Sequence, residues 1–352
     1  MVMGMNKVSM LDCTLRDGGW VNQFQFGRTA MEAVIRETEA AGIEYVELGY
    51  LDEKRGSCED RSEYSDLQAI VNNGLDEGGK KAQRFVMIDW GKYPVSSLPV
   101  QSASGIQGIR LCFHKKDIEK ALEAGQGILE KGYRLMLQPM VCARYTEGEL
   151  KELVIRVREE LEGAAGFYIV DSFGSMTEQE IKKRMILADG LLPSSIALGL
   201  HAHNNLNRAF SNGMAALDLD LEREIILDST LEGIGKGAGN IKSEELAAYL
   251  NRRCQKTYDA ARLKSAALRW IRPIAADHVW GCSPEYELSA RYGMTPTYAS
   301  FFFREHQCSL SETEKLLGLI PDQKKDSFDR EMAERVWYEY KINGENRGGR
   351  GI

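Results

Sequence analysis

Eight short apolar runs recur along the first two thirds of the chain. Their composition is continuous rather than alternating, which is typical of parallel strands that are covered on both faces. Segments with helical periodicity lie between most of them, and two of these open at Thr146 and Thr177, which can cap a helix. Eight strands alternating with helices over ~250 residues predict a (β/α)8 TIM barrel. The predicted strands are residues 7–13, 43–50, 84–89, 108–114, 133–140, 166–172, 196–203 and 223–230.

An open, doubly wound sheet is the alternative arrangement of the same elements. That fold would carry a glycine-rich phosphate loop after its first strand, and the sequence LRDGGW at residues 15–20 does not match G-x-G-x-x-G. One step of the barrel pattern is weak, because residues 90–105 lack a convincing helix. We therefore predict a barrel domain over residues 1–255 with one irregular connection.

The pattern changes near residue 255. Residues 256–342 have helical character and many aromatic, Met and Leu side chains, and they show no further alternation of strand and helix. This stretch predicts an appended helical C-terminal domain. The last residues, 343–352, are rich in glycine and charge and predict a flexible tail.

Composition narrows the classes of partner. The net charge is −7, so there is no basic excess of the kind that nucleic acid or an anionic membrane surface attracts. No apolar run approaches the ~20 residues that a membrane helix needs. The seven cysteines are scattered and contain no Cys-x-x-Cys, which favours reduced thiols over a disulfide framework or a zinc knuckle. We expect a soluble, cytoplasmic protein.

Two histidines stand at the end of the seventh predicted strand. Side chains two apart on a strand point the same way, so His201 and His203 can offer two imidazoles to one cation. A pair of structural histidines at the barrel mouth is the alternative. Asp17, at the end of the first strand, adds a carboxylate, and two imidazoles with one carboxylate are typical of a catalytic metal site with open positions.

Arg16 stands directly before Asp17. The two could simply pair, but a buried ion pair contributes little stability by itself. Adjacent residues on a strand point to opposite faces, and we expect Gly18 and Gly19 to permit a turn that brings both side chains into one cavity.

Other polar side chains also stand at predicted strand ends. The glycine-rich stretch 232–240 follows the eighth strand, and its Asn240 could supply a neutral oxygen to a metal, or could cap the next helix. The remaining strand-end candidates are Glu47, His114, Asp171 and Ser172.

Five motifs together resemble the metal-dependent pyruvate aldolase superfamily, the DRE-TIM metallolyases. This superfamily includes 4-hydroxy-2-oxovalerate aldolase, hydroxymethylglutaryl-CoA lyase and 2-isopropylmalate synthase. The C-terminal stretch 292–306 is more loosely similar to the helical domain of the hydroxyoxovalerate aldolases. The motifs, in the family's order, are DCTLRDGG (12–19), VELG (46–49), VDSFGSM (170–176), GLHAHNN (199–205) and LEGIGKGAGN (231–240).

The resemblance implies a divalent metal and a role for each motif. The metal would be Mn²⁺ or Mg²⁺, with Zn²⁺ or Co²⁺ as alternatives, and the oxygens of pyruvate would chelate it. Arg16 would face the developing enolate oxygen, which suits a fixed charge aimed at transition-state charge. Glu47 and Asp171 would order the surroundings of Arg16 and of the ligands. The implied metal ligands are Asp17, His201, His203 and Asn240.

The sequence departs from the family at Trp20. Hydroxyoxovalerate aldolases typically carry a histidine at this position, three residues past the metal aspartate, as the general base for the 4-hydroxyl. Tryptophan cannot transfer a proton, so the base would be a metal-bound water, His114 or Tyr298, whose hydroxyl has an ordinary pKa near 10 and would need a shift. An indole stacks well on sugar C–H groups or planar ligands, so Trp20 predicts an acceptor pocket for a polyhydroxylated aldehyde or a larger electrophile. Asp171 and Ser172 are further candidates for binding substrate.

The function that follows is a class II aldolase, a carbon–carbon lyase that acts through a pyruvate-type enolate. A Claisen-type synthase that condenses an acyl-CoA with a 2-oxo acid is the alternative within the superfamily, and a non-catalytic barrel that acts as a binding subunit is the alternative outside it. The expected partners are a 2-oxo acid and an aldehyde. A homodimer is expected by default, and an aldehyde dehydrogenase partner is left open.

Overall fold

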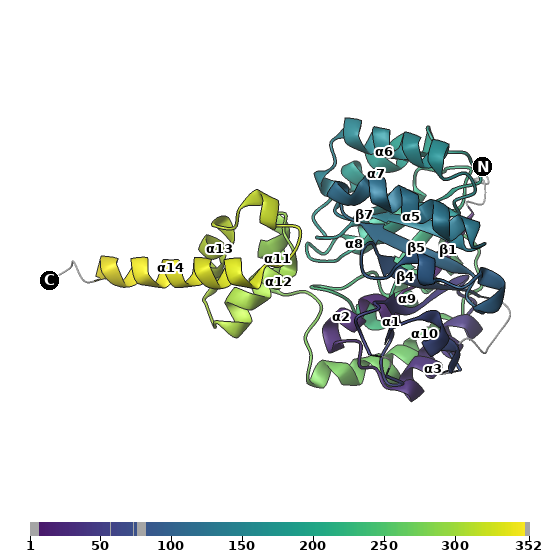
Figure 1. Cartoon of the computed structure of the whole chain (residues 1–352). Helices are drawn as coiled ribbons and strands as arrows, with labels where there is room; N and C mark the ends of the chain where they lie inside the picture. The colour runs from purple at the N-terminus through teal and green to yellow at the C-terminus, as the bar shows by residue number, and fades with distance from the viewer. Residues whose placement is uncertain (1–6, 57, 73, 76–81, 349–352) are drawn as a thin grey trace.

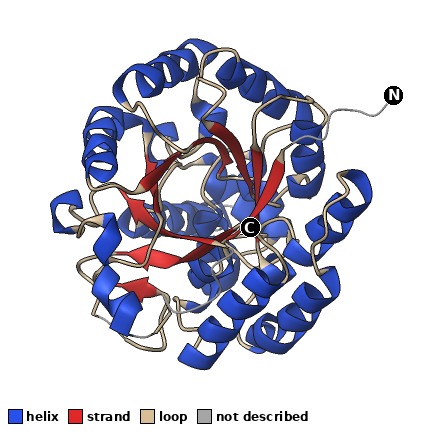
Figure 2. Ribbon diagram, turned by 90° about the vertical axis from the view of Figure 1, so that its right-hand side faces the viewer, coloured by secondary structure: helices blue, strands red, loops and turns tan. Residues whose placement is uncertain are grey.

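Eight parallel strands close into a barrel at the centre of the molecule. The computed structural model describes residues 7–56, 58–72, 74–75 and 82–348, and for residues 343–348 it describes the backbone only. Strand order runs β1-β9-β8-β7-β6-β5-β4-β2, and β1 also pairs with β2, which closes the ring (Figure 2). A two-residue strand, β3 (Glu63–Tyr64), adds beside β2. The barrel strands are β1 (Val8–Asp12), β2 (Tyr45–Leu51), β4 (Gln83–Asp89), β5 (Gly108–Phe113), β6 (Arg134–Pro139), β7 (Gly166–Asp171), β8 (Ala197–Ala202) and β9 (Ile225–Ser229).

This closed ring confirms the predicted TIM barrel and rules out the open sheet. Helices surround the strands, and the two predicted threonine caps are present as full capping boxes at Thr146 and Thr177. The weak step in the pattern, residues 90–105, contains only short turns at Val95–Ser97 and Gln101–Ala103. The surrounding helices are α3 (Arg28–Ala40), α4 (Leu67–Asn72), α5 (Ile118–Glu130), α6 (Glu147–Glu160), α7 (Glu178–Asp189), α8 (Ala209–Leu217) and α9 (Ser243–Arg253).

The apolar side chains form two main clusters. The large one fills the barrel and the layer beneath its helices, and it includes Leu263 and Ile271 of the segment α10 (Ala260–Ala266) and its continuation. The second is centred on Tyr298, Phe301 and Leu316. Residues of the two clusters follow one another along the chain, and the division into domains at residue 255 stays a prediction.

The second cluster holds together a set of helices that extends to one side of the barrel (Figure 1). Part of the predicted tail, 343–348, continues the last of these helices, and 349–352 lie outside the described residues. Within the described part of the chain, no helix is long and apolar enough to cross a membrane. The helices of this set are α11 (Pro284–Arg291), α12 (Pro296–Ser300), α13 (Leu310–Gly318) and α14 (Arg330–Gly348).

Candidate metal centre

The chain leaves β1 through a single helical turn. This turn, α1 (Thr14–Asp17), lets the Arg16 Nη1 group donate to Asp17 Oδ1 at 2.7 Å although the two residues are adjacent. The predicted reason was wrong, because Gly18 has a φ of −61° that any residue can adopt. Both glycines are needed for space instead. An added Cβ would lie 2.4 Å from the Thr14 carbonyl oxygen at Gly18, and 2.1 Å from the ring of Phe24 at Gly19.

The three predicted ligands Asp17, His201 and His203 come together at the carboxyl ends of β1 and β8. Each offers one ligand atom, and these atoms all lie within 4.8 Å of one another. The two Nε2 atoms of the histidines are 3.3 Å apart, and His203 Nδ1 is 4.0 Å from Asp17 Oδ2. All three side chains are buried. This is the spacing that ligands of a single small cation require.

The protonation states of His203 and Asp17 also suit the binding of a metal ion. Burial lowers the pKa of His203 to about 4, so its imidazole is neutral at pH 7 and keeps a free lone pair. Burial alone would raise the pKa of Asp17, but Arg16 and the two histidines outweigh that effect, and the pKa lies well below its usual range. The site therefore presents one carboxylate and neutral imidazole to a cation.

Asp228 at the end of β9 fixes the orientation of His201. Its Oδ2 lies 2.9 Å from His201 Nδ1, and it is held ionised because Arg110 and His201 outweigh the effect of burial on its pKa. The carboxylate accepts the Nδ1–H, and this assignment leaves the lone pair of Nε2 facing His203. A second possible ligand group, Cys13 with His201 and Asp228, is less suitable, since burial, reinforced by Asp228, raises the pKa of the Cys13 thiol well above its usual value.

Asn240 reaches the same carboxylate from the glycine-rich loop. Its Nδ2 donates to Asp17 Oδ2, while its buried Oδ1 has no hydrogen-bond partner among the described residues. An added Cβ at Gly235 would lie 2.1 Å from Asn240 Nδ2 and 2.4 Å from Asp17 Oδ2. Gly239, with a φ of +77°, lets the loop close on the Gly233 carbonyl. The backbone thus packs directly against the amide–carboxylate pair, and the free Oδ1 is a neutral oxygen suited to a divalent cation.

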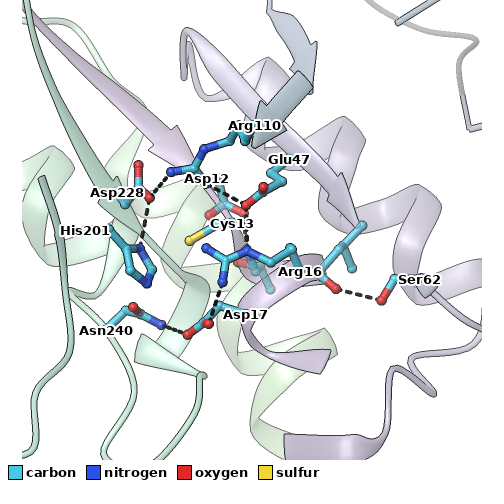
Figure 3. A network of polar contacts seen from close by, with 12 residues as sticks. Asp12, Cys13, Arg16, Asp17, Glu47, Ser62, Arg110, His201, Asp228 and Asn240 are labelled. Atoms are coloured by element: carbon cyan, nitrogen blue, oxygen red, sulfur yellow. Dashed lines mark hydrogen bonds and ion pairs between the residues drawn. The ribbon is translucent and has the colours of Figure 1, made fainter. Parts of the chain in front are cut away.

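A buried chain of alternating charges adjoins these candidate ligands (Figure 3). Arg16 Nε donates to Glu47 Oε2 at 2.9 Å, and Arg110 Nη1 donates to the same oxygen at 2.7 Å. The other arm of Arg110 donates to Asp228, which holds His201. Arg110 is fully buried, and its guanidinium also lies 4.8 Å from the ring centroid of Tyr168. The chain therefore connects the guanidinium expected at the enolate with a predicted metal ligand.

Sequence reasoning missed Arg110 and Asp228. Both interrupt strands that are otherwise apolar, GIRLCF and IILDS. A charged residue in a strand covered on both faces must find a buried partner. That signal was present in the sequence and could have identified both residues.

Aromatic side chains form one wall of the barrel mouth. Trp20, in α2 (Gly19–Asn22), is half exposed and meets Phe24 and Tyr50 edge to face, with ring centroids 5.3 Å and 6.1 Å apart. Phe24 and Tyr50 pack with Met87 in a small cluster of their own. Trp20 therefore stands at the open end of the barrel, close in the chain to Asp17.

The two other proton-transfer candidates both contact the segment between α13 and α14. His114, at the end of β5, has its Nε2 3.4 Å from Ser327 Oγ. Tyr298 is fully buried, and its hydroxyl lies 3.1 Å from the carbonyl oxygen of Lys324 and accepts the backbone N–H of Asp329. A catalytic role for either residue stays a prediction.

Asp171 and Ser172 organise loops at the end of β7. Asp171 is fully buried and accepts the backbone N–H groups of Ser175 and Met176, and burial raises its pKa to about 6. The Ser172 hydroxyl accepts the N–H of Val141 at 2.9 Å. Their predicted contact with substrate stays untested, and these hydrogen bonds give both residues a structural role.

A family model described as HMGL-like matches residues 114–268. Among curated relatives, an oxaloacetate decarboxylase from Mycobacterium tuberculosis is 25% identical over 301 residues, which covers 84% of this chain and 81% of the relative. A 4-hydroxy-2-oxovalerate aldolase from Thermomicrobium roseum is 29% identical over 271 residues, covering 75% of this chain and 72% of the relative. These matches confirm the resemblance that the five motifs predict.

Solved structures with the same fold include an HMG-CoA lyase from Brucella melitensis. It superposes with a TM-score of 0.61 at 14% identity and covers 77% of this chain and all of its own. The N-terminal domain of a proposed aldolase from Bacteroides vulgatus gives a TM-score of 0.69 at 23% identity, with 85% of this chain and 98% of that domain covered. At these identities the structures support the barrel fold alone.

Proposed function

We propose that this chain, a carbon–carbon lyase related to the HMGL-like enzymes, is a divalent-metal-dependent aldolase that cleaves or forms 4-hydroxy-2-oxo acids through a pyruvate enolate. The observation that carries the proposal is the meeting of Asp17, His201 and His203 within 4.8 Å, directly beside the Arg16 guanidinium. Relatives with aldolase and decarboxylase names support it, because both reactions release the same enolate.

The residues present fit a divalent cation. Asp17, His201 and His203 would hold it, and the free Oδ1 of Asn240 adds a neutral oxygen. When bound, a divalent ion supplies Lewis-acid stabilisation of negative charge on the substrate. Mn²⁺ or Mg²⁺ suits the carboxylate and amide oxygens, and the two imidazoles also suit Zn²⁺ or Co²⁺.

Arg16 supplies the protein's own charge for the enolate. Two of its nitrogen atoms are fixed by Glu47 and Asp17, and its Nη2 has no hydrogen-bond partner among the described residues. A guanidinium held rigidly in a buried site needs little reorganisation when negative charge develops on a substrate oxygen. Glu47 positions Arg16, and Arg110 positions Glu47.

The half-exposed Trp20 and its neighbours favour an acceptor aldehyde larger than acetaldehyde. Their edge-to-face rings offer apolar faces for sugar-like C–H groups at the mouth of the barrel.

Exchange of the pyruvate methyl protons in D₂O tests the proposal directly. NMR should show exchange in the presence of Mn²⁺ or Mg²⁺, loss of exchange after chelation, and recovery when the metal is returned. An Asp17→Asn variant should exchange far more slowly, and a panel of 4-hydroxy-2-oxo acids then identifies the acceptor. Absence of exchange with every metal would overturn the proposal, and thiol release from acetyl-CoA with a 2-oxo acid would favour the Claisen-type synthase.

A further inference from the structure

Lys236 places a titratable amine beside Trp20, a residue that cannot transfer a proton. It lies in the glycine-rich loop after β9, four residues before Asn240. Its Nζ stands 5.6 Å from the centroid of the Trp20 ring. We propose that Lys236 transfers the proton of the substrate's C4 hydroxyl, the task that a histidine at position 20 performs in hydroxyoxovalerate aldolases. The inference rests on the proposed aldolase activity and assigns a residue to its acceptor half.

The loop holds the backbone of Lys236 in a fixed conformation. The Lys236 carbonyl accepts the N–H of Gly239 at 3.1 Å, and the Ala238 N–H donates to the Asn205 side chain at 2.8 Å. Gly237, with a φ of +64°, packs so closely that an added Cβ would lie 2.8 Å from Asn205 Oδ1. The Lys236 side chain therefore extends from a fixed backbone position toward the Trp20 ring.

The surroundings of the amine suit a group that gains and loses a proton. Lys236 forms no ion pair with any residue in the described part of the chain, and its amine lies over the face of the Trp20 ring. Burial lowers the pKa of Lys236, while Asp17 and Asp89 act in the opposite direction. Burial is the main reason that the pKa of His203 is lowered, and the positive charge of Lys236 adds to that effect.

The proposed step balances as follows in the cleavage direction. The neutral amine of Lys236 accepts the proton of the C4 hydroxyl as the C3–C4 bond breaks. The oxygen's electron pair forms the aldehyde carbonyl, and the C3–C4 bonding pair becomes the C2–C3 double bond of the pyruvate enolate beside Arg16. Water then protonates C3, and the Lys236 ammonium returns its proton to solvent, so that the 4-hydroxy-2-oxo acid yields pyruvate and an aldehyde.

Oxaloacetate provides a matched reaction that omits this proton transfer. Its decarboxylation gives the same enolate when C3 loses carbon dioxide, and no hydroxyl proton has to leave. A residue that serves only the C4 hydroxyl is needed for aldol cleavage and is dispensable for decarboxylation.

The test compares Lys236→Met, which removes the amine, with Lys236→Arg, which keeps a charge that does not give up its proton at neutral pH. Both should lower kcat for cleavage of the best 4-hydroxy-2-oxo acid by ~100-fold or more, the usual scale of general acid–base catalysis, and should change oxaloacetate decarboxylation by less than about fivefold. Lys242→Met, in the same segment but paired with Glu232, should change neither reaction.

Three results would overturn the assignment. Full aldol activity in Lys236→Met would show that the amine is dispensable. Full activity in Lys236→Arg would show that charge alone matters. An equal loss of decarboxylation in Lys236→Met would show that the residue acts on the metal or on Arg16. Failure of wild-type protein to exchange pyruvate protons would instead count against the proposed function.

Discussion

Replacing Arg110 by Met tests whether the buried charge chain both stabilises the barrel and holds the site. Arg110 is fully buried and serves two carboxylates, Glu47 and Asp228, which are themselves buried. Removing one partner of a buried pair costs about 3–5 kcal/mol, because the remaining charge is left uncompensated. Glu47 keeps Arg16 at 2.9 Å and Asp228 keeps His201 at 2.9 Å, so we expect the lower end, about 3 kcal/mol.

Function should fall as well. Without Arg110, Glu47 and Asp228 each lose one of the partners that fix them, so Arg16 and His201 are oriented less firmly. Loss of a group that orients metal ligands usually lowers metal affinity or activity by about 10–100-fold. Urea unfolding of the metal-free protein measures the loss of stability. The Mn²⁺ dependence of pyruvate proton exchange measures the loss of metal affinity and activity.

Arg84→Met is the matched control. Arg84 is also buried and pairs with Glu39 at 2.7 Å, but it stands near the start of β4, at the end of the barrel opposite the metal ligands. We expect a similar loss of stability with unchanged proton exchange in the folded protein. If Arg110→Met costs less than about 1 kcal/mol, or if both variants slow exchange equally, the buried chain does not do what its geometry indicates.

Two further substitutions test a steric effect at Gly235 and the effect of a buried charge at Asp171. Gly235→Ala should weaken metal binding and activity by ~10-fold or more, because its Cβ would press on Asp17 and Asn240. The control variant Gly148→Ala, whose Cβ meets open space in α6, should bind metal normally. Equal metal affinity in the two variants would contradict this prediction. Asp171 has a folded pKa of about 6 against the ordinary 3.8, so its contribution to stability is complete below pH 4 and is lost as the pH rises to about 6. Asp171→Asn should therefore gain stability relative to wild type by up to about 3 kcal/mol over that interval, and urea unfolding at several pH values would show a constant difference if the assignment is wrong.

The barrel could be predicted from the sequence because its strands are covered on both faces. Continuous apolar runs marked all eight strands, and each observed boundary lies within two residues of the predicted one. The irregular connection at 90–105 was also visible, since its sequence has no helical period. Continuous apolar runs indicate which segments are buried as strands, and the limits of those runs show where each strand ends.

The site was only partly predictable, for a physical reason. The candidate ligands Asp17, His201 and His203 follow from strand ends and spacing, but the residues that contact them depend on which strands face one another across the barrel. Arg110 from β5 crosses the interior to reach β2 and β9, a contact that no local pattern encodes. Gly18 and Gly19 were predicted to permit a backbone turn, and only the packing shows that they are needed to leave space for neighbouring atoms.

The two parts of the candidate site differ in how tightly the surrounding structure constrains them. Arg16 and His201 are joined through Glu47, Arg110 and Asp228 by three buried ion pairs and the hydrogen bond between Asp228 and His201, so a substitution at any link leaves a buried charge without its partner. Trp20, by contrast, is half exposed and is held by aromatic contacts at the mouth. We expect a change at that position to cost little stability, so residue 20 can differ while the buried site that would hold the metal is kept. This asymmetry fits a chain that keeps the candidate metal ligands and departs at Trp20 from the aldolases that its motifs resemble.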